Sequence, residues 1–264
     1  MRDMTSKGPR SAATLIGVVF GVSLAVAGTA LQAADATPES GAAPARPPTQ
    51  RLQDLVPGAT LGEPQPTPVD GIFRVGIDGN YLYLTADGLH AFTGDLLDLA
   101  AGQNLTEMRR NADRLAALDG LPEDALLILP AHGEERARVH VFTDSTCPYC
   151  QKLHREVSEL RNAGVTVAYI PFPRAGLQGP GYQELRTIWC SEDRAAAFDI
   201  ATGEAPGTLP AYAGNCPAAA AVDTGYRLGE AMAVRGTPTI VLPNGGVLPG
   251  YVEPGALFER LWRE

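Results

Sequence analysis

The sequence has few of the residues that build metal sites, and its basic residues form no cluster. It contains four cysteines and four histidines, and no two histidines form an H-x-x-x-H pair. A structural zinc site needs four ligands at suitable spacing, so we expect no bound metal. The formal net charge is -9. Because phosphate binding needs a clustered basic surface, we also expect no nucleic-acid partner.

The N-terminus has the layout of an export signal. Basic residues come first, an uncharged apolar stretch follows at 12–27, and small residues lie at 30–34. This order predicts a signal peptide at 1–33 with cleavage near Ala33. The alternative is an uncleaved membrane anchor, because about 20 apolar residues can span a bilayer. The uncharged run extends to Ala34, and the glycines, threonine and glutamine in it favour the signal peptide, and therefore export.

The tetrad at 147–150, Cys-Pro-Tyr-Cys, follows an apolar strand pattern at 139–143 and begins a helical pattern at 148–162. Two thiols at this spacing at a helix N-terminus can form a disulfide with each other, and the unpaired backbone N–H groups there favour the thiolate of the first one. We therefore predict that Cys147 is the nucleophile and that Cys150, one turn inside the helix and less exposed, is the resolving thiol. The alternative is an inert structural disulfide.

The four cysteines, Cys147, Cys150, Cys190 and Cys216, allow three pairings. Proximity favours Cys147 with Cys150, which would leave Cys190 with Cys216. The sequence alone leaves the three pairings open.

The segments before the tetrad predict a tether and a small β domain. Residues 34–50 are too poor in large apolar residues to pack, which predicts a disordered tether. In 51–103, Asp78-Gly79 and Asp87-Gly88 separate short apolar runs, as is typical of tight hairpin turns. We predict a β-meander with strands at 72–77, 81–85 and 90–97. Its open sheet edges would invite a second copy of the chain, so we interpret 51–103 as a dimerisation domain.

The rest of the chain predicts a linker helix and a larger domain. Asn104 and Glu107 fit a capping box before an amphipathic helix at 105–118, within a linker at 104–120. In 121–264 we predict strands at 125–129, 139–143, 165–170, 239–242 and 247–251, helices at 148–162 and 254–262, and a broken helical insertion at 182–230. A βαβ half followed by a ββα half describes a thioredoxin-like domain, so the fold class is α+β.

Gly236, Thr237 and Pro238 directly precede the predicted strand at 239–242. A thioredoxin-like fold implies a cis proline at this place, facing the dithiol. We expect the Thr237 backbone to lie beside Cys147, where an extended substrate could pair with it as an added strand. The alternative is an ordinary trans proline at the start of a strand.

Together these motifs resemble those of the DsbC/DsbG family of periplasmic disulfide isomerases, from Leu52 to the C-terminus. The resemblance is carried by the tetrad and by seven further segments. These are Pro68-Val69-Asp70-Gly71, Val141-Phe142-Thr143-Asp144-Ser145-Thr146, Lys152-Leu153-His154, Phe172-Pro173-Arg174-Ala175-Gly176-Leu177, Ile188-Trp189-Cys190, Gly236-Thr237-Pro238 and Leu248-Pro249-Gly250-Tyr251.

The resemblance implies a homodimer joined through small, cystatin-like N-terminal domains, and a structural disulfide between Cys190 and Cys216. It implies an enzyme of the periplasm that needs no cofactor. This enzyme would rearrange or reduce wrong disulfides in unfolded or misoxidised exported proteins, and a DsbD-type membrane reductase would re-reduce it. Pro148 replaces the glycine usual in the DsbC branch and follows the DsbG pattern. The segments around Trp189 and Tyr251 are more similar to DsbC.

Two other functions remain open at this point, a DsbG-like reductase with chaperone activity and a dithiol oxidase that donates its disulfide. Two residues near the tetrad have alternative roles. His154 could influence the thiols, although a histidine at such a place more often packs or caps. Asp144 could accept a proton from Cys150, although a loop carboxylate more often accepts hydrogen bonds from the local backbone.

Overall fold

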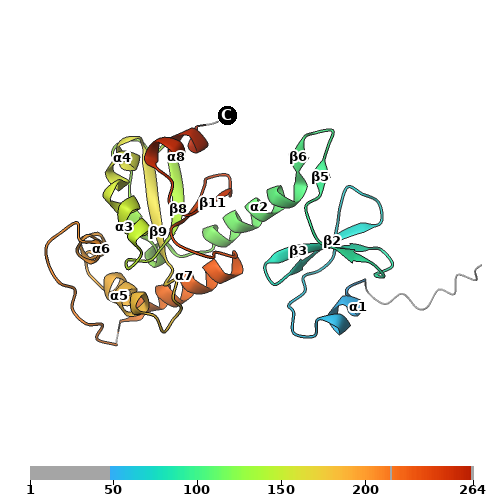
Figure 1. The fold of residues 1–264 in the computed structure, drawn as a ribbon, viewed down its shortest axis with the longest axis horizontal. Coiled ribbons are helices and arrows are strands. Elements are labelled where there is room, and N and C mark those ends of the chain that lie inside the picture. Colours follow the sequence, from blue (N-terminus) through green and yellow to red (C-terminus); the bar gives the residue numbers. More distant parts are fainter. Residues whose placement is uncertain (1–47, 215, 263–264) are drawn as a thin grey trace, which may run out of the picture. The chain divides into compact units, whose positions relative to one another are not determined.

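The structure is a computed structural model that describes residues 48–214 and 216–262 (Figure 1). The predicted signal peptide, the alternative anchor and most of the predicted tether lie outside the described residues. The tether prediction is wrong for residues 48–50, because they form the first turn of helix α1 (Pro48–Leu55). In the described part of the chain, no helix has the length and apolar character needed to cross a membrane.

The predicted β-meander is a four-stranded antiparallel sheet in the order β1-β2-β3-β4. Its strands are β1 (Gln65–Pro66), β2 (Ile72–Ile77), β3 (Asn80–Thr85) and β4 (Ala91–Phe92). Asp78 and Gly79 turn the central hairpin with φ of 46° and 78°, the left-handed values that a two-residue I′ turn requires. The predicted strand at 90–97 is too long. Gly94, with φ of 133°, follows β4, and Leu97–Asp98 (β5) instead pairs with Gln103–Asn104 (β6).

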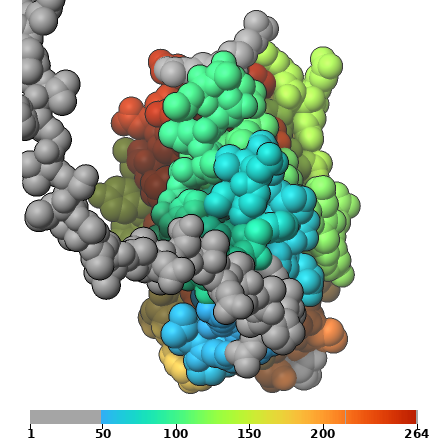
Figure 2. All heavy atoms as spheres, turned by 90° about the vertical axis from the view of Figure 1, so that its right-hand side faces the viewer, coloured from blue at the N-terminus to red at the C-terminus, as the bar shows by residue number. Residues whose placement is uncertain are grey.

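The N-terminal module at 48–104 has a small core and an apolar surface. Val75, Leu82 and Leu84 form its buried apolar cluster, and the side chain of Tyr83 is buried as well. Six large apolar side chains of the module are exposed, namely Leu55, Val69, Leu89, Phe92, Leu97 and Leu99. Figure 2 turns this module, coloured blue to green, toward the viewer. So few buried residues provide little stability by themselves.

Helix α2 (Leu105–Asp119) follows the module and ends at Gly120, as predicted. The Asn104 side chain accepts a hydrogen bond from the backbone N–H of Glu107 at 2.9 Å. The Glu107 carboxylate pairs with Arg114 at 2.7 Å, so its charge is balanced within the helix. Near the C-terminal end of the helix, Leu118 is buried in the core of the following domain.

The C-terminal domain is built on a mixed sheet of five strands in the order β11-β10-β8-β9-β7. Only the central pair, β8 and β9, is parallel. The strands are β7 (Leu127–Leu129), β8 (Ala137–Thr143), β9 (Val165–Pro171), β10 (Thr239–Val241) and β11 (Val247–Pro249). This is the predicted βαβ half followed by a ββα half.

Six helices belong to this domain (Figure 1): α3 (Pro148–Arg155), α4 (Val157–Asn162), α5 (Pro180–Trp189), α6 (Arg194–Thr202), α7 (Ala220–Ala231) and α8 (Pro254–Leu261). Two 3-10 turns, η1 (Glu123–Ala125) and η2 (Pro217–Ala219), complete it. Alternate strand residues face opposite sides, as a pleated sheet requires. Val141 and Tyr169 pack with α3 to α6, α8 and the start of α7, whereas Phe142 and Ile170 pack with the later part of α7 and the end of α2.

Three element predictions need correction. The helix predicted at 148–162 breaks at Glu156, where three-residue turns replace helical hydrogen bonds: the Glu156 N–H bonds to the Leu153 carbonyl, and the Glu159 N–H bonds to the Glu156 carbonyl. The strand predicted from 125 starts at Leu127, because η1 precedes it. The strand predicted to 251 ends at Pro249, because Gly250 adopts φ of 88°.

Helix α7 lies unusually close to the end of β9. A Cβ atom at Gly225 would lie 2.3 Å from the Pro171 carbonyl oxygen, and one at Gly229 would lie 2.3 Å from the Phe172 ring. Any side chain at these positions would push the helix away from the sheet.

Candidate active site

The first cysteine of the tetrad lies where a strand gives way to a helix. Cys147 is the N-cap of α3, with Pro148 in the first turn, where a missing N–H is tolerated. The backbone N–H of Cys147 donates to the Asp144 carbonyl at 2.9 Å. Its thiol donates to the backbone carbonyl of Thr237 at 3.2 Å, and the Thr237–Pro238 peptide bond is cis. The fold therefore brings the predicted nucleophile and the predicted proline loop together.

Cys147 and Cys150 are both free thiols, and both are buried. Their exposed fractions are 0% and 1%. The surface of Cys147 is covered as fully as that of Cys150, because the loop at Thr237, ninety residues later in the chain, lies against its sulfur. Sequence spacing along one helix carried no information about this distant segment.

The two thiols differ in acidity rather than in exposure. The pKa of Cys147 is lowered to about 5, first by a hydrogen bond from the Cys150 thiol, then by the Thr237 side chain and by the backbone N–H groups of Cys150 and Tyr149. The pKa of Cys150 is raised, first by burial and then by the neighbouring Cys147 sulfur. At neutral pH the pair therefore holds one thiolate, on Cys147, and one proton, on Cys150.

Asp144 is buried, with 1% of its surface exposed, and it fixes the loop before Cys147. One carboxylate oxygen accepts hydrogen bonds from the backbone N–H and hydroxyl of Thr146, at 2.9 and 2.7 Å. The other accepts from the backbone N–H of Arg174 at 3.0 Å, and the Arg174 guanidinium lies 3.7 Å away. The interpretation of Asp144 as a carboxylate bonded to local backbone is confirmed.

His154 is buried one turn after Cys150 on α3, with 4% of its surface exposed. Its Nδ1 lies 3.1 Å from the Tyr169 hydroxyl, and its Nε2 lies 2.7 Å from the Asp199 carboxylate. Burial lowers the pKa of His154, and Asp199 offsets part of this effect. His154 therefore packs in the core, as expected of a histidine at such a place, and both of its ring nitrogens have polar partners. Sequence reasoning missed Asp199, which lies 45 residues further on in the insertion and has no local motif.

Sequence reasoning also missed the contact of a tetrad residue, Tyr149, with Tyr251. Tyr149 is 61% exposed, and its ring stacks on that of Tyr251 at 6.4 Å between centroids. The Lys152 ammonium lies 4.3 Å from the centre of the Tyr251 ring, and the Tyr251 hydroxyl donates to the Glu156 carboxylate. Tyr251 therefore connects the segment after β11 to the break between α3 and α4.

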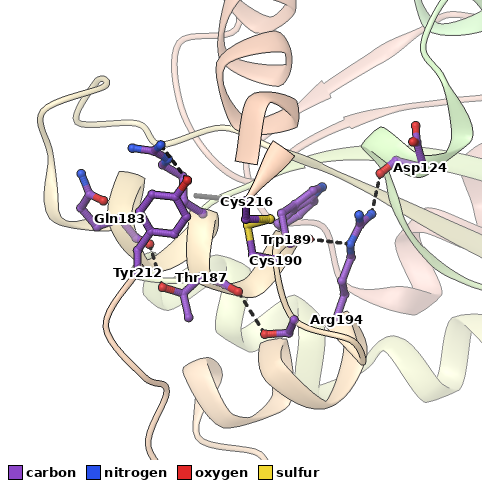
Figure 3. Close-up of a disulfide and its surroundings, with 10 residues drawn as sticks. Asp124, Gln183, Thr187, Trp189, Cys190, Arg194, Tyr212 and Cys216 are labelled. Carbon is purple, nitrogen blue, oxygen red and sulfur yellow. Dashed lines mark hydrogen bonds between the residues drawn. A yellow bond between two sulfur atoms is a disulfide. The ribbon is translucent and has the colours of Figure 1, made fainter. Parts of the chain in front are cut away.

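The second cysteine pair forms a disulfide outside this site (Figure 3). Cys190, at the end of α5, is bonded to Cys216 across 26 residues, with a Cα–Cα distance of 6.0 Å. The neighbouring Trp189 is buried and donates its indole N–H to the Ala125 carbonyl at 2.8 Å. Arg194 donates to the carbonyls of Trp189 and Asp124. The disulfide and these hydrogen bonds from side chains to backbone carbonyls hold the region together.

The chemistry available at the site is that of its sulfur atoms. Among the residues that the structure describes, no three side chains of the metal-ligating types lie together so that they could hold an ion. A stabilised thiolate can attack a disulfide and form a mixed disulfide, and the neighbouring thiol can then break this mixed disulfide.

Comparison with known proteins gives a match over both domains. A Thioredoxin-like domain model matches residues 123–263, and a Disulfide bond isomerase protein N-terminal domain model matches residues 30–107. The thiol:disulfide interchange protein DsbC of Escherichia coli (strain K12) is 36% identical over 208 residues, which cover 77% of this chain and 82% of the relative. The DsbC of Salmonella typhimurium is 37% identical over 199 residues, which cover 75% of this chain and 79% of the relative.

Among solved structures, a disulfide interchange protein from Neisseria gonorrhoeae is similar at 29% identity and a TM-score of 0.43, covering 53% of this chain and 96% of that one. The relatives match across both domains and over most of their own length, as the sequence resemblance implied. This chain therefore belongs to the DsbC family of thiol:disulfide interchange proteins.

Proposed function

We propose that this protein is a disulfide isomerase of the periplasm, which rearranges wrong disulfides in exported proteins through Cys147 and Cys150. The observation that carries the proposal is the unequal acidity of two adjacent thiols at the N-terminus of α3, with the pKa of Cys147 lowered to about 5 and that of Cys150 raised. Such a pair supplies a nucleophile at neutral pH, while the second thiol stays protonated until it resolves the mixed disulfide.

In this mechanism the Cys147 thiolate attacks a wrong disulfide of the client. One client sulfur leaves as a thiolate, and a mixed disulfide joins the other to Cys147. A client thiol can then displace Cys147, which completes an isomerisation. Otherwise Cys150 displaces the client, which leaves reduced, and a DsbD-type membrane reductase must reduce the resulting Cys147–Cys150 disulfide. No cofactor is needed for these steps.

The substrate would bind beside the cis-proline loop. The backbone of Thr237 lies against the Cys147 sulfur, so an extended client segment paired with the residues at Thr237 and Pro238 would present its disulfide to the nucleophile. In this proposal the Cys190–Cys216 disulfide is structural and takes no part in exchange.

The assembly would be a homodimer joined through the N-terminal domain, residues 51–103, with a linker at 104–120 and a catalytic domain at 121–264. The six exposed apolar side chains of the N-terminal module support this proposal, because an apolar surface of this kind marks an interface. Export would follow from the signal peptide predicted at 1–33.

The test uses the chain from Ala34 onward and a client whose disulfides have been scrambled. The protein should restore the client, and Cys147→Ala should abolish this activity. Cys150→Ala should retain part of it and accumulate the mixed disulfide. An unimpaired Cys147→Ala variant would contradict the proposal. Deletion of 51–103 should remove most isomerisation while sparing simple thiol reduction, and equal isomerisation by the truncated chain would contradict the dimer.

The redox state of the pair in cells distinguishes the rival functions. A mainly reduced pair supports the isomerase, because only a reduced Cys147 can attack a client disulfide. A mainly oxidised pair would identify a dithiol oxidase. Suppression of client aggregation by Cys147→Ala, without any loss relative to the unsubstituted protein, would show an additional chaperone activity.

A further inference from the structure

Three polar side chains of the C-terminal domain, Tyr169, His154 and Asp199, form a hydrogen-bonded chain. The Tyr169 hydroxyl lies 3.1 Å from His154 Nδ1, and His154 Nε2 lies 2.7 Å from Asp199 Oδ1. Tyr169 and His154 are buried, whereas the Asp199 side chain is 44% exposed. The chain therefore leads from the interior of the domain to solvent.

The inner end of this chain, Tyr169, lies within electrostatic range of Cys150, which is one of the groups that raise its pKa after burial itself. His154 follows Cys150 by four residues on α3, and both are buried. Residues at this spacing lie on the same helix face about 5 to 6 Å apart, and the side chain of the later residue points back toward the earlier one. Tyr169 belongs to the same core as Leu153 and Val141, which come from α3 and from the strand that precedes it.

Cys150 needs a route for its proton. Burial raises its pKa, so the thiol remains protonated at neutral pH, yet it must become a thiolate before it can attack. With 1% of its surface exposed, it has little direct contact with water. An internal acceptor would therefore determine how fast it can react.

We propose that Tyr169, His154 and Asp199 carry the proton of Cys150 to solvent when Cys150 resolves the mixed disulfide. This inference rests on the proposed function of the two thiols and assigns a positioning and proton-transfer role to residues that do not touch the client. The phenol passes the proton from the thiol to the imidazole, and the imidazole passes one to the Asp199 carboxylate, which exchanges it with water.

The step balances in atoms and electrons. The Cys150 sulfur gives up its proton and forms the Cys147–Cys150 bond, while the bond between Cys147 and the client sulfur breaks. The client sulfur leaves with the electron pair as a thiolate. Cys147 and Cys150 are thereby oxidised, and the client is reduced. The proton leaves by way of Asp199, so no further reactant is required.

The charged and titratable groups around His154 come from three elements besides its own helix. Tyr169 faces it from β9, and Asp199 faces it from α6. Glu204, after α6, raises the pKa of His154 but is itself paired with Arg155 at 3.6 Å. Asp199 is therefore the group placed to take up a proton from the imidazole.

The test follows the two thiols separately with Ellman's reagent, a disulfide of two nitrobenzoate thiols, in the full exported chain. Attack by Cys147 releases one coloured thiol and attack by Cys150 releases the second, so stopped-flow absorbance gives two phases. Cys150→Ala identifies the second phase by abolishing it. The test variants are Asp199→Asn, which keeps the shape of a half-exposed side chain, and His154→Gln. The matched control is Phe198→Leu, which removes ring contacts with Tyr169 and His154 and leaves the hydrogen bonds.

We expect both test variants to slow the second phase at neutral pH by about tenfold or more and to leave the first phase within about twofold. Without the internal acceptor, the second phase should also rise with pH by close to tenfold per unit, because hydroxide must then remove the proton. A second phase unchanged in both variants would overturn the proposal, and so would equal slowing of both phases together with the Phe198→Leu control. Absence of the first phase in the unsubstituted protein would instead overturn the proposed function.

Discussion

The sulfur of Cys147 lies 3.2 Å from the backbone carbonyl oxygen of Thr237. A thiol donates a hydrogen bond to this oxygen, whereas a thiolate has no proton to donate and is repelled by it. Deprotonation removes this hydrogen bond, and the sulfur is then stabilised by the groups that lower its pKa, namely the Cys150 thiol, the Thr237 side chain and the N–H groups of Cys150 and Tyr149. When the nucleophile forms, its contact with the proline loop therefore passes from the carbonyl of Thr237 to its side chain.

The first prediction concerns the titration of Cys147. Its thiolate should persist down to about pH 5, since its pKa is lowered to about 5. The ultraviolet absorbance of the thiolate and the rate of alkylation should both fall with a midpoint there. Cys147→Ser should remove this transition, and Cys150→Ala should raise the midpoint because it removes the main stabilising donor. A midpoint near that of an ordinary thiol, about 8.5, would contradict the prediction.

The second prediction concerns the pH dependence of stability. The pKa of Cys147 is lower in the folded chain than in the unfolded chain, so its contribution is complete above the unfolded pKa and is lost as pH falls toward about 5. The free energy of unfolding of the reduced protein, relative to Cys147→Ser, should therefore rise between about pH 5 and 8, by at most about 1.4 kcal/mol per unit. Urea titrations at several pH values measure it. A constant difference would contradict the shift.

The third prediction concerns the loop before the tetrad. Asp144→Ala should lower the free energy of unfolding by about 2 to 4 kcal/mol, because the part-buried backbone N–H groups of Thr146 and Arg174 lose their acceptor. Arg174→Ala is the matched control. It keeps the backbone N–H and removes an ion pair and a 3.5 Å hydrogen bond to the Thr146 carbonyl, both made by a side chain that is 45% exposed, which should cost less than about 1 kcal/mol. Equal losses in the two variants would show that the carboxylate is not what fixes the loop.

The fourth prediction concerns the Cys190–Cys216 disulfide. The double variant Cys190→Ser/Cys216→Ser should unfold with a free energy lower by about 3.5 kcal/mol, since the bond closes a loop of 26 residues and restricts the unfolded chain. Urea unfolding of the oxidised proteins measures the difference. The control is Cys147→Ser/Cys150→Ser, which keeps this disulfide and should retain most of the stability. A larger loss in the control would reverse the structural assignment of the two pairs.

The fifth prediction concerns the contact of α7 with β9. Gly225→Ala should destabilise the protein by about 1 to 3 kcal/mol, because the added Cβ would lie 2.3 Å from the Pro171 carbonyl oxygen. Gly255→Ala, in the first turn of α8, is the control. It has no neighbouring atom within 4 Å and should be neutral or stabilising by up to about 1 kcal/mol. Thermal unfolding of the pair measures the contrast, and similar midpoints would show that α7 moves at little cost.

Local chemistry made much of the fold predictable. The hairpin of β2 and β3 follows from Asp78-Gly79, whose left-handed backbone conformation meets the turn requirement. The start of α2 follows from Asn104 in the same way. The strand-to-helix position of Cys147 could be predicted equally well, because the apolar run of β8 ends only a short loop before the tetrad.

Contacts between distant segments could not be predicted. Glutamate favours a continuous helix, yet Glu156 breaks it in a structure where the Tyr251 hydroxyl, 95 residues later, bonds to its carboxylate. The burial of Cys147 depends on Thr237, and the partner of His154 lies in the insertion. Only the folded arrangement brings these pairs together.

The Cys190–Cys216 disulfide encloses α6, and α6 carries the carboxylate that bonds to His154 on α3. The segment that carries this carboxylate is thus part of a loop closed by a disulfide, the same kind of bond that the neighbouring thiols would attack. The protein must acquire this bond correctly before its dithiol helix has a fixed neighbour. Exported as proposed, the protein would form this bond in the same oxidising environment as the clients that it repairs.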